Sequence, residues 1–214
     1  MATTEEMDRM YRWTRHVYDF SRKYYLLGRD RLLYEMELQS GNRVIEIGCG
    51  TARNLIKLAR NRPDVRCYGL DVSTEMLATA EAHVKARKLQ DRITLTHCFA
   101  EKLDYAKTFG LDAPFDAAFF SYSLSMIPPF REAVDAALAS IKRGGVMYVV
   151  DFWDQGKWPG FFRTALKRWL DMFHVHFRPE LLEYLQELDT KGIGSLSVKS
   201  VAGRYAYIAT FRKL

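Results

Sequence analysis

Short apolar runs rich in β-branched residues alternate with helical patterns from residue 43 onward. Five runs read as strands, at residues 43–48, 65–71, 92–99, 115–121 and 146–152. The segments predicted as helices between them are residues 52–62, 73–88 and 130–141. Strand and helix alternating in this way indicate parallel βαβ units and a sheet covered on both faces.

The predicted ends of these helices follow local signals. Pro63 ends the first helix, and Ser73 or Thr74 is the expected N-cap of the second. Gly144 and Gly145 are expected to end the third helix.

Both ends of the chain depart from the alternating pattern. Residues 195–213 read as two strands around Gly203, which predicts an antiparallel hairpin at one end of the sheet. Residues 1–40 look helical and are rich in Arg and Tyr. We therefore expect an N-terminal helical cap over residues 1–40 and one domain over residues 41–214.

The composition is that of a folded protein. The chain has 214 residues, of which 48% are hydrophobic and 27% charged, so disorder is excluded. Its three cysteines form no CxxC pair, which favours a reducing compartment over a disulfide scaffold or zinc finger. The start of the chain lacks an apolar signal core, and no uncharged run reaches the ~20 residues of a membrane span. We expect a cytoplasmic protein.

The most informative motif is the glycine turn, residues 46–52, where the first strand passes into the first helix. Gly48 and Gly50 let a ligand approach the backbone, and the helix start that follows favours a carboxylate or phosphate. Asp71 ends the second strand, where a carboxylate can accept hydrogen bonds from ribose hydroxyls. Together they predict an adenosine-type cofactor, and the alternative is a tight turn beside a surface Asp.

Arg53 occupies the position where a dinucleotide-binding fingerprint needs its third glycine. The turn instead resembles motif I of the class I S-adenosylmethionine (SAM)-dependent methyltransferases, with Ala52 in place of the last glycine. The resemblance implies a Rossmann-like α/β fold, with a mostly parallel seven-stranded sheet, helices on both faces and an antiparallel C-terminal hairpin. It implies SAM as cofactor, bound by Glu46, Gly48, Cys49, Gly50, Asn54, Asp71, Val72, Met76, Phe99, Ala100 and Ser121.

One of these positions departs from the family pattern. Phe99 stands where the family often has an Asp that bonds the adenine amino group. Phe99 is therefore expected either to pack on the purine face or to be a core residue at a strand end.

Two stretches combine basic and aromatic residues. Residues 9–31 contain seven basic and two acidic residues, a net +5 out of the chain's +6. Residues 158–178, within a predicted insertion at 155–180, have aromatic residues at helical spacing with Arg and Lys between them. Such elements are typical of contact with an anionic membrane surface. The alternatives are plain packing and RNA contact, and we expect no nucleic-acid partner.

Three patterns resemble the diacylglyceryl-homoserine N-methyltransferases: Y-R-W-x-x-x-x-Y-D-x-x-R at residues 11–22, L-x-G-R at residues 26–29 and V-I-E-I-G-C-G-T-x-R-N-L at residues 44–55. These enzymes make a bacterial betaine lipid and are similar to bacterial phosphatidylethanolamine N-methyltransferases. The resemblance implies methylation of the homoserine amine of a lipid substrate, by a protein peripheral to the inner face of the membrane. It leaves the oligomeric state open.

An amine acceptor must lose a proton before it can be methylated, and a nearby carboxylate, His or Tyr could accept it. Tyr18 in the cap, Tyr122 after the fourth strand and Asp151 at the end of the fifth are the candidates. No metal is expected. Three alternatives stay open: a phosphatidylethanolamine N-methyltransferase, a SAM enzyme acting on a soluble small amine or acid, and a non-catalytic binding module.

Overall fold

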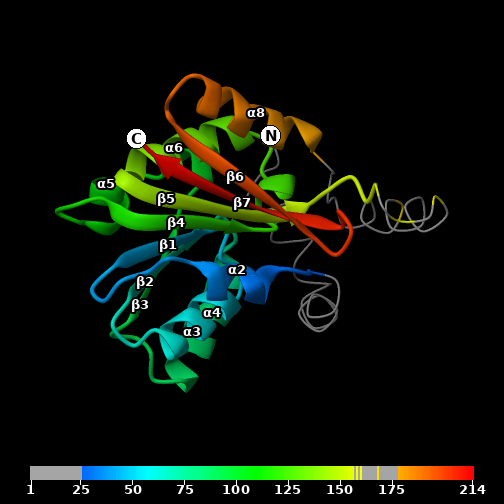
Figure 1. Ribbon diagram of the computed structural model, residues 1–214. Helices are drawn as coiled ribbons and strands as arrows, with labels where there is room; N and C mark the ends of the chain where they lie inside the picture. Colours follow the sequence, from blue (N-terminus) through cyan, green and yellow to red (C-terminus); the bar gives the residue numbers. More distant parts are fainter. Residues whose placement is uncertain (1–25, 157, 159, 161–167, 169–177) are drawn as a thin grey trace.

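A single seven-stranded sheet organises the molecule (Figure 1). The computed structural model describes residues 26–156, 158, 160, 168 and 178–214. The strand order is β3-β2-β1-β4-β5-β7-β6. The strands are β1 (Arg43–Ile47), β2 (Arg66–Asp71), β3 (Ile93–His97), β4 (Phe115–Ser121), β5 (Ile141–Phe152), β6 (Gly194–Val201) and β7 (Ala206–Lys213). The first five pair in parallel, whereas β7 runs antiparallel to both β5 and β6.

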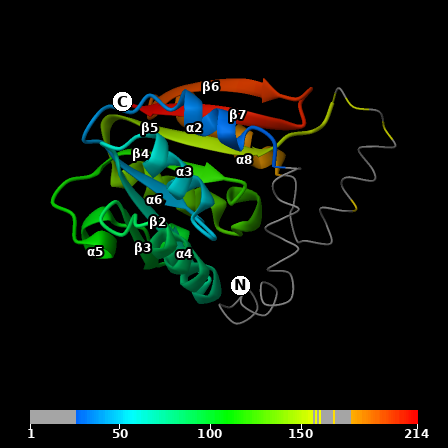
Figure 2. The same cartoon turned by 90° about the horizontal axis from the view of Figure 1, so that it is seen from below.

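Helices cover both faces of the sheet (Figures 1 and 2). One core layer contains the apolar sides of α2 (Arg29–Glu35), α3 (Arg53–Asn61) and α4 (Thr74–Ala86). The other contains those of α6 (Phe130–Ser140) and α8 (Pro179–Thr190), with the short α5 (Tyr105–Phe109) at its edge. Two short 3₁₀ helices, η1 (Ala100–Lys102) and η2 (Leu124–Met126), follow β3 and β4. The predicted fold class is therefore confirmed.

Several predicted boundaries are also confirmed. The fourth strand has its predicted bounds, and the two C-terminal strands form the expected hairpin. Ser73 is the N-cap of α4, where its hydroxyl accepts a hydrogen bond from the Met76 amide at 3.3 Å.

The predicted boundary between the third helix and the fifth strand is wrong. Helix α6 ends at Ser140, and β5 begins at once at Ile141. The register with β4 then shifts between Phe115 and Ala117, so that residues 142–145 form a bulge. Gly145 is needed there because a Cβ would lie 2.8 Å from the Lys142 carbonyl oxygen. The two glycines thus permit a bulge and do not cap a helix.

The flanks are described only in part. Helix α2 lies within the segment predicted as a helical cap, and α8 begins within the predicted insertion and continues to Thr190. Most of the remaining basic aromatic residues lie outside the described residues. Within the part of the chain that the structure describes, no helix is long and apolar enough to cross a membrane.

Candidate active site

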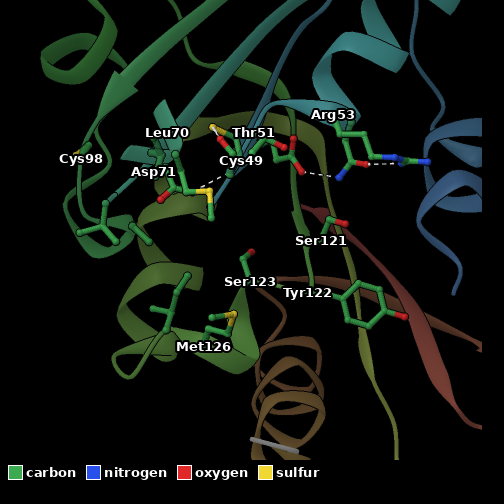
Figure 3. A pocket seen from close by; sticks show the side chains of 18 of the residues that line it. Cys49, Thr51, Arg53, Leu70, Asp71, Cys98, Ser121, Tyr122, Ser123 and Met126 are labelled. Atoms are coloured by element: carbon green, nitrogen blue, oxygen red, sulfur yellow. Dashed lines mark hydrogen bonds between the residues drawn. The ribbon is translucent and has the colours of Figure 1, made fainter. Parts of the chain in front are cut away.

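A cavity of about 850 Å³ opens at the carboxyl ends of the parallel strands. Its walls come from the segments that follow β1, β2, β3 and β4. Figure 3 shows Asp71 on one side of this space and Ser123 and Met126 across from it. Open parallel sheets bind ligands at this edge, and small-molecule pockets commonly measure ~300–1,000 Å³. The cavity therefore has the place and the size of a cofactor site.

The glycine turn forms the floor of the cavity. The amides of Gly48 and Cys49 both donate to the Leu70 carbonyl oxygen at 2.9 Å, which ties the turn to the end of β2. Gly48 has φ +76°, and a Cβ there would lie 2.6 Å from the Ser123 Cβ. Gly50 is also left-handed, with φ 52°. A larger residue at position 48 would therefore force the turn away from the end of β4.

Asp71 connects the turn to the start of α4. Its Oδ2 accepts a hydrogen bond from the Gly50 amide at 2.7 Å, and its Oδ1 accepts one from the Ser73 amide at 2.9 Å. The carboxylate also lines the cavity. It is thus held in place by backbone contacts while it faces the space where a ligand would bind, and its role toward ribose stays a prediction.

Glu46 is a buried carboxyl group beside this turn. Only 2% of the residue is exposed. Its Oε1 accepts a hydrogen bond from the Asn54 amide nitrogen at 2.7 Å, whereas its Oε2 is buried without a hydrogen-bond partner. Burial raises the pKa of Glu46 to about 8, against opposing effects of Asn54 and Arg29. Glu46 can therefore accept a further hydrogen bond, above all from a cation.

The residues predicted to bind the cofactor come together around this one cavity. They are Glu46, Gly48, Cys49, Gly50, Asn54, Asp71, Val72, Met76, Phe99, Ala100 and Ser121. Ser121 contributes a buried hydroxyl that has no hydrogen-bond partner. Two carboxyl groups, a glycine turn and polar atoms without partners fit a ligand that carries a ribose and an ammonium group, as SAM does.

Of the two predicted catalytic residues that the structure describes, Tyr122 lines the cavity and Asp151 does not. Its ring packs edge-on against Phe152, with centroids 4.7 Å apart. Its hydroxyl donates to the Leu27 carbonyl oxygen at 2.5 Å. The structure thus shows Tyr122 tied to the backbone of the N-terminal segment. Tyr18 lies outside the described residues.

Asp151 is not among the residues that line the cavity. It is buried, and its carboxylate accepts hydrogen bonds from the Phe152 amide at 2.8 Å and the Ser125 amide at 3.0 Å. Burial raises its pKa to about 6, although these bonds act in the opposite direction. Because η2 contains Ser125 and Met126, and Met126 does line the cavity, Asp151 supports the cavity wall from behind.

Sequence reasoning missed two parts of the lining. Arg29 from α2 lines the cavity, although the sequence indicated it as part of the basic stretch and of the resemblance, and not as a cavity residue. An apolar wall follows β4, made of Met126, Ile127, Pro128 and Pro129. The two adjacent prolines were a signal for a fixed loop at this edge of the sheet.

Comparison with known proteins agrees with this site. A family described as a methyltransferase domain matches residues 44–145. A demethylmenaquinone methyltransferase of Geobacillus stearothermophilus is 31% identical over 123 residues, which is 57% of this chain and 50% of that protein. The 27-O-demethylrifamycin SV methyltransferase of Amycolatopsis mediterranei is 28% identical over 58% of this chain and 43% of that protein. The chain thus spans about half the length of the curated relatives it matches.

Solved structures share the fold over nearly the whole chain. The [4+2]-cyclase SpnF superposes with a TM-score of 0.77 at 18% identity, covering 99% of this chain and 96% of that one. A SAM-dependent methyltransferase from Aquifex aeolicus gives a TM-score of 0.65 at 17% identity, with coverage of 90% and 93%. Residues 44–145 thus match a methyltransferase domain, the chain as a whole has the fold of solved SAM-dependent methyltransferases, and SAM is the cofactor that these likenesses imply.

Proposed function

We propose that this protein transfers a methyl group from SAM to an acceptor at the carboxyl edge of its sheet. The observation that carries the proposal is the juxtaposition of Glu46 and Asp71 on the two sides of the glycine turn, in a cavity of about 850 Å³. SAM supplies an electrophilic methyl group when it is bound. The chain's own residues have to bind the cofactor and the acceptor, orient the two toward each other and exclude water.

Each side of the cavity has a distinct part in this reaction. On the β1–β2 side, Asp71 and the turn hold polar groups of the cofactor. On the β4 side, the wall of residues 126–129 is apolar and keeps water from the reacting atoms. An acceptor that enters along this wall would contact it with an apolar part of its own structure.

The acceptor in this proposal is the homoserine amine of a diacylglyceryl-homoserine lipid, at the surface of a membrane. The support is the resemblance at residues 11–22 and 44–55 and the net +5 charge of residues 9–31. A basic aromatic segment of this kind would bring the protein to an anionic surface. Phosphatidylethanolamine is the alternative lipid acceptor.

Tyr18 remains the first candidate to accept the amine proton, because the Tyr122 hydroxyl is donated to a backbone carbonyl and Asp151 lies behind the wall. This assignment predicts that Tyr18→Phe lowers the methylation rate and leaves cofactor affinity unchanged.

A small-molecule acceptor is the second candidate. The observation that favours it is the similarity to two methyltransferases whose names give demethylmenaquinone and 27-O-demethylrifamycin SV as their substrates. In that case the aromatic flanks would close over the acceptor as a lid.

The two candidates are separated by supplying SAM with a labelled methyl group to the full chain. One reaction contains vesicles with the homoserine lipid, a second contains phosphatidylethanolamine vesicles, and a third contains a soluble metabolite extract. We expect label in the homoserine lipid, identified by mass spectrometry as mono-, di- and trimethylated products. Label found only in the soluble fraction would overturn the lipid proposal and keep the methyltransferase.

A further inference from the structure

Arg178, the residue before α8, contacts both ends of the apolar wall at residues 126–129. Its Nε donates a hydrogen bond to the Ser125 carbonyl oxygen at 3.3 Å, just before the wall begins. Its guanidinium lies 5.5 Å from the centroid of the Phe130 ring, just after the wall ends. A guanidinium this close to an aromatic ring is attracted to the face of the ring. The two contacts therefore hold the Arg178 guanidinium alongside the segment that lines the cavity.

Arg178 keeps hydrogen-bond donors for a ligand. Its Nε is engaged by Ser125, whereas neither Nη has a hydrogen bond or an ion pair with any residue that the structure describes. The side chain is partly exposed, so a ligand can reach it. A guanidinium carries five N–H donors in a planar arrangement that fits a carboxylate or a phosphate. The donors left on Arg178 therefore suit an anionic group.

The buried Asp151 carboxylate does not occupy these donors. The charge of Arg178 acts on Asp151 and favours its ionised form, but no ion pair within 4.0 Å joins the two residues. The Asp151 oxygens instead accept hydrogen bonds from the Phe152 and Ser125 amides. Ser125 thus lies between them, with its amide on Asp151 and its carbonyl oxygen on Arg178.

A second guanidinium lies over the same aromatic ring. Arg131 is 5.8 Å from the centroid of Phe130. Its charge is offset only in part, because its partner Glu187, at 3.4 Å, also pairs with Lys191 at 2.6 Å. Two positive charges within 6 Å of one ring repel each other, and an anion bound near both would relieve that repulsion. The surroundings of Phe130 therefore favour an anionic ligand.

We propose that Arg178, assisted by Arg131, binds an anionic group of the methyl acceptor beside the apolar wall. We call this place the anionic subsite. The inference rests on the proposed function and deepens it, because it names a second group by which the acceptor is recognised besides its amine. The shared chemistry is a carboxylate or phosphate in the same headgroup as the amine. The homoserine carboxylate is the favoured source, and the phosphate of phosphatidylethanolamine is the other.

The test compares two soluble acceptors that differ only in the charge of this group. One is the diacylglyceryl-homoserine lipid with two hexanoyl chains, and the other is its methyl ester, in which the carboxylate is neutralised. Methylation with labelled SAM gives KM and kcat for the full chain and for Arg178→Gln. We expect Arg178→Gln to raise the KM of the acid about tenfold or more and to leave that of the ester within about twofold.

The ester distinguishes binding of the anion from a merely structural role. If Arg178 only holds the wall in place, its loss changes both acceptors alike, so an equal rise of both KM values would overturn the inference. The ester also reports folding, since a variant that methylates it normally has an intact cavity. An unchanged KM of the acid in Arg178→Gln would likewise overturn the inference.

Two further variants complete the series. Arg143→Gln is the matched control, because Arg143 is exposed in the bulge at the opposite end of β5 and its loss removes the same charge. It should leave both KM values at those of wild type. Arg131→Gln should raise the KM of the acid severalfold, less than Arg178→Gln does, because Arg131 also pairs with Glu187. An unchanged KM there would overturn the part of Arg131.

Dihexanoyl-phosphatidylethanolamine tests phosphate as the source of the anionic group. If Arg178→Gln raises the KM of this lipid and leaves that of the homoserine acid unchanged, the assignment to the carboxylate is overturned. A rise for the homoserine acid alone supports the assignment. A rise for both lipids supports an anionic subsite that accepts either group.

Calorimetry with S-adenosylhomocysteine present separates this inference from the proposed function. If wild type binds the acid more tightly than the ester and Arg178→Gln loses that difference, the anionic subsite is supported even where neither acceptor is methylated, and only the proposed function fails. If wild type methylates acid and ester with equal KM, the proposed function stands and the inference is overturned. Wild type that neither binds nor methylates the acid would overturn both.

Discussion

Gly48 and Gly144 have nearly the same backbone conformation in different surroundings. Their φ angles are +76° and +74°, but only at Gly48 would a Cβ meet another atom within 3 Å, the Ser123 Cβ. A comparison of the stabilities of Gly48→Ala and Gly144→Ala thus separates the steric clash at the turn from the strain of a left-handed backbone.

We expect Gly48→Ala to lower the free energy of unfolding by about 1–3 kcal/mol more than Gly144→Ala, because overpacking adds to the shared backbone strain. Denaturant unfolding of both variants measures this difference. Equal losses would show that the approach of the turn to Ser123 is not tight.

Asp71 should matter for any ligand that carries the ribose of the cofactor. Its carboxylate holds the Gly50 and Ser73 amides and lines the cavity. We expect Asp71→Ala to weaken both S-adenosylhomocysteine and methylthioadenosine by about 1–3 kcal/mol, since both carry the ribose. Calorimetry checks this, and unchanged affinities would contradict the ribose contact.

At the scale of elements, the short helix η2 depends on β5. The Asp151 carboxylate at the end of β5 accepts the Ser125 amide, while Arg178, just before α8, donates its Nε hydrogen to the Ser125 carbonyl oxygen at 3.3 Å. One turn of helix is thus held from two sides. These two bonds, together with the burial of Leu124 and Ser125, fix this short helix at the cavity wall.

This arrangement predicts a pH dependence of stability. Burial raises the pKa of Asp151 from its ordinary 3.8 to about 6, so between these values the folded state holds a proton that the unfolded state lacks. The contribution of Asp151 to the free energy of unfolding therefore falls as the pH rises from about 4 to about 6. Among the described residues, Arg178 opposes this shift, and Tyr207 is a further titratable group that interacts with Asp151.

We expect Asp151→Asn to gain stability relative to wild type by up to about 3 kcal/mol as the pH rises from 4 to 7. Urea unfolding at several pH values measures the gain. Asp112→Asn is the contrast, because Arg43 holds the pKa of Asp112 below its ordinary value and the sign of the difference should reverse. Parallel stability curves for wild type and Asp151→Asn would contradict the prediction.

Tyr122 acts between two elements, since it connects the end of β4 to the segment before α2. We expect Tyr122→Phe to lower the free energy of unfolding by about 1 kcal/mol, because the hydrogen bond to the Leu27 carbonyl is lost. Denaturant unfolding measures this loss, and an unchanged free energy of unfolding would contradict the bond.

At the scale of the whole molecule, charge is unevenly distributed along the chain. Residues 9–31 contribute +5 of the net +6. Each basic residue near an anionic membrane contributes about 1 kcal/mol to binding, and salt screens this attraction. The charge pattern therefore makes vesicle binding by this protein testable through its salt dependence.

We expect the triple variant Arg12→Gln, Arg15→Gln, Arg22→Gln to bind phosphatidylglycerol vesicles about a hundredfold more weakly. Its control is the triple variant Arg60→Gln, Lys85→Gln, Lys88→Gln, which removes the same charge from exposed positions on and after α3 and α4. Co-sedimentation at low and high salt measures the binding. Equal loss in both triple variants would assign the attraction to net charge alone.

The sequence by itself determined the order of the strands along the chain, the three helices between the first five of them that were predicted, the fold class and the residues of the glycine turn, whereas the short α5 was expected to be loop. These follow from local periodicity and from residue types that tolerate few backbone conformations, so they need no knowledge of distant contacts. The predicted cofactor residues line one cavity because they lie at or just after the carboxyl ends of predicted parallel strands, which meet at one edge of the sheet. The bulge at Gly144 and Gly145 was missed because it depends on the register between β4 and β5.

Only the tertiary structure decided what each polar group faces. Arg29 looked like one charge among many, and its place beside Glu46 depends on how α2 packs on β5 and on Tyr122. Asp151 and Tyr122 were both expected at the reaction centre. The structure shows each in a hydrogen bond with a distant backbone group, 26 residues away for Asp151 and 95 residues away for Tyr122. Such partners are distant along the chain and near in space, so spacing in the sequence does not reveal them.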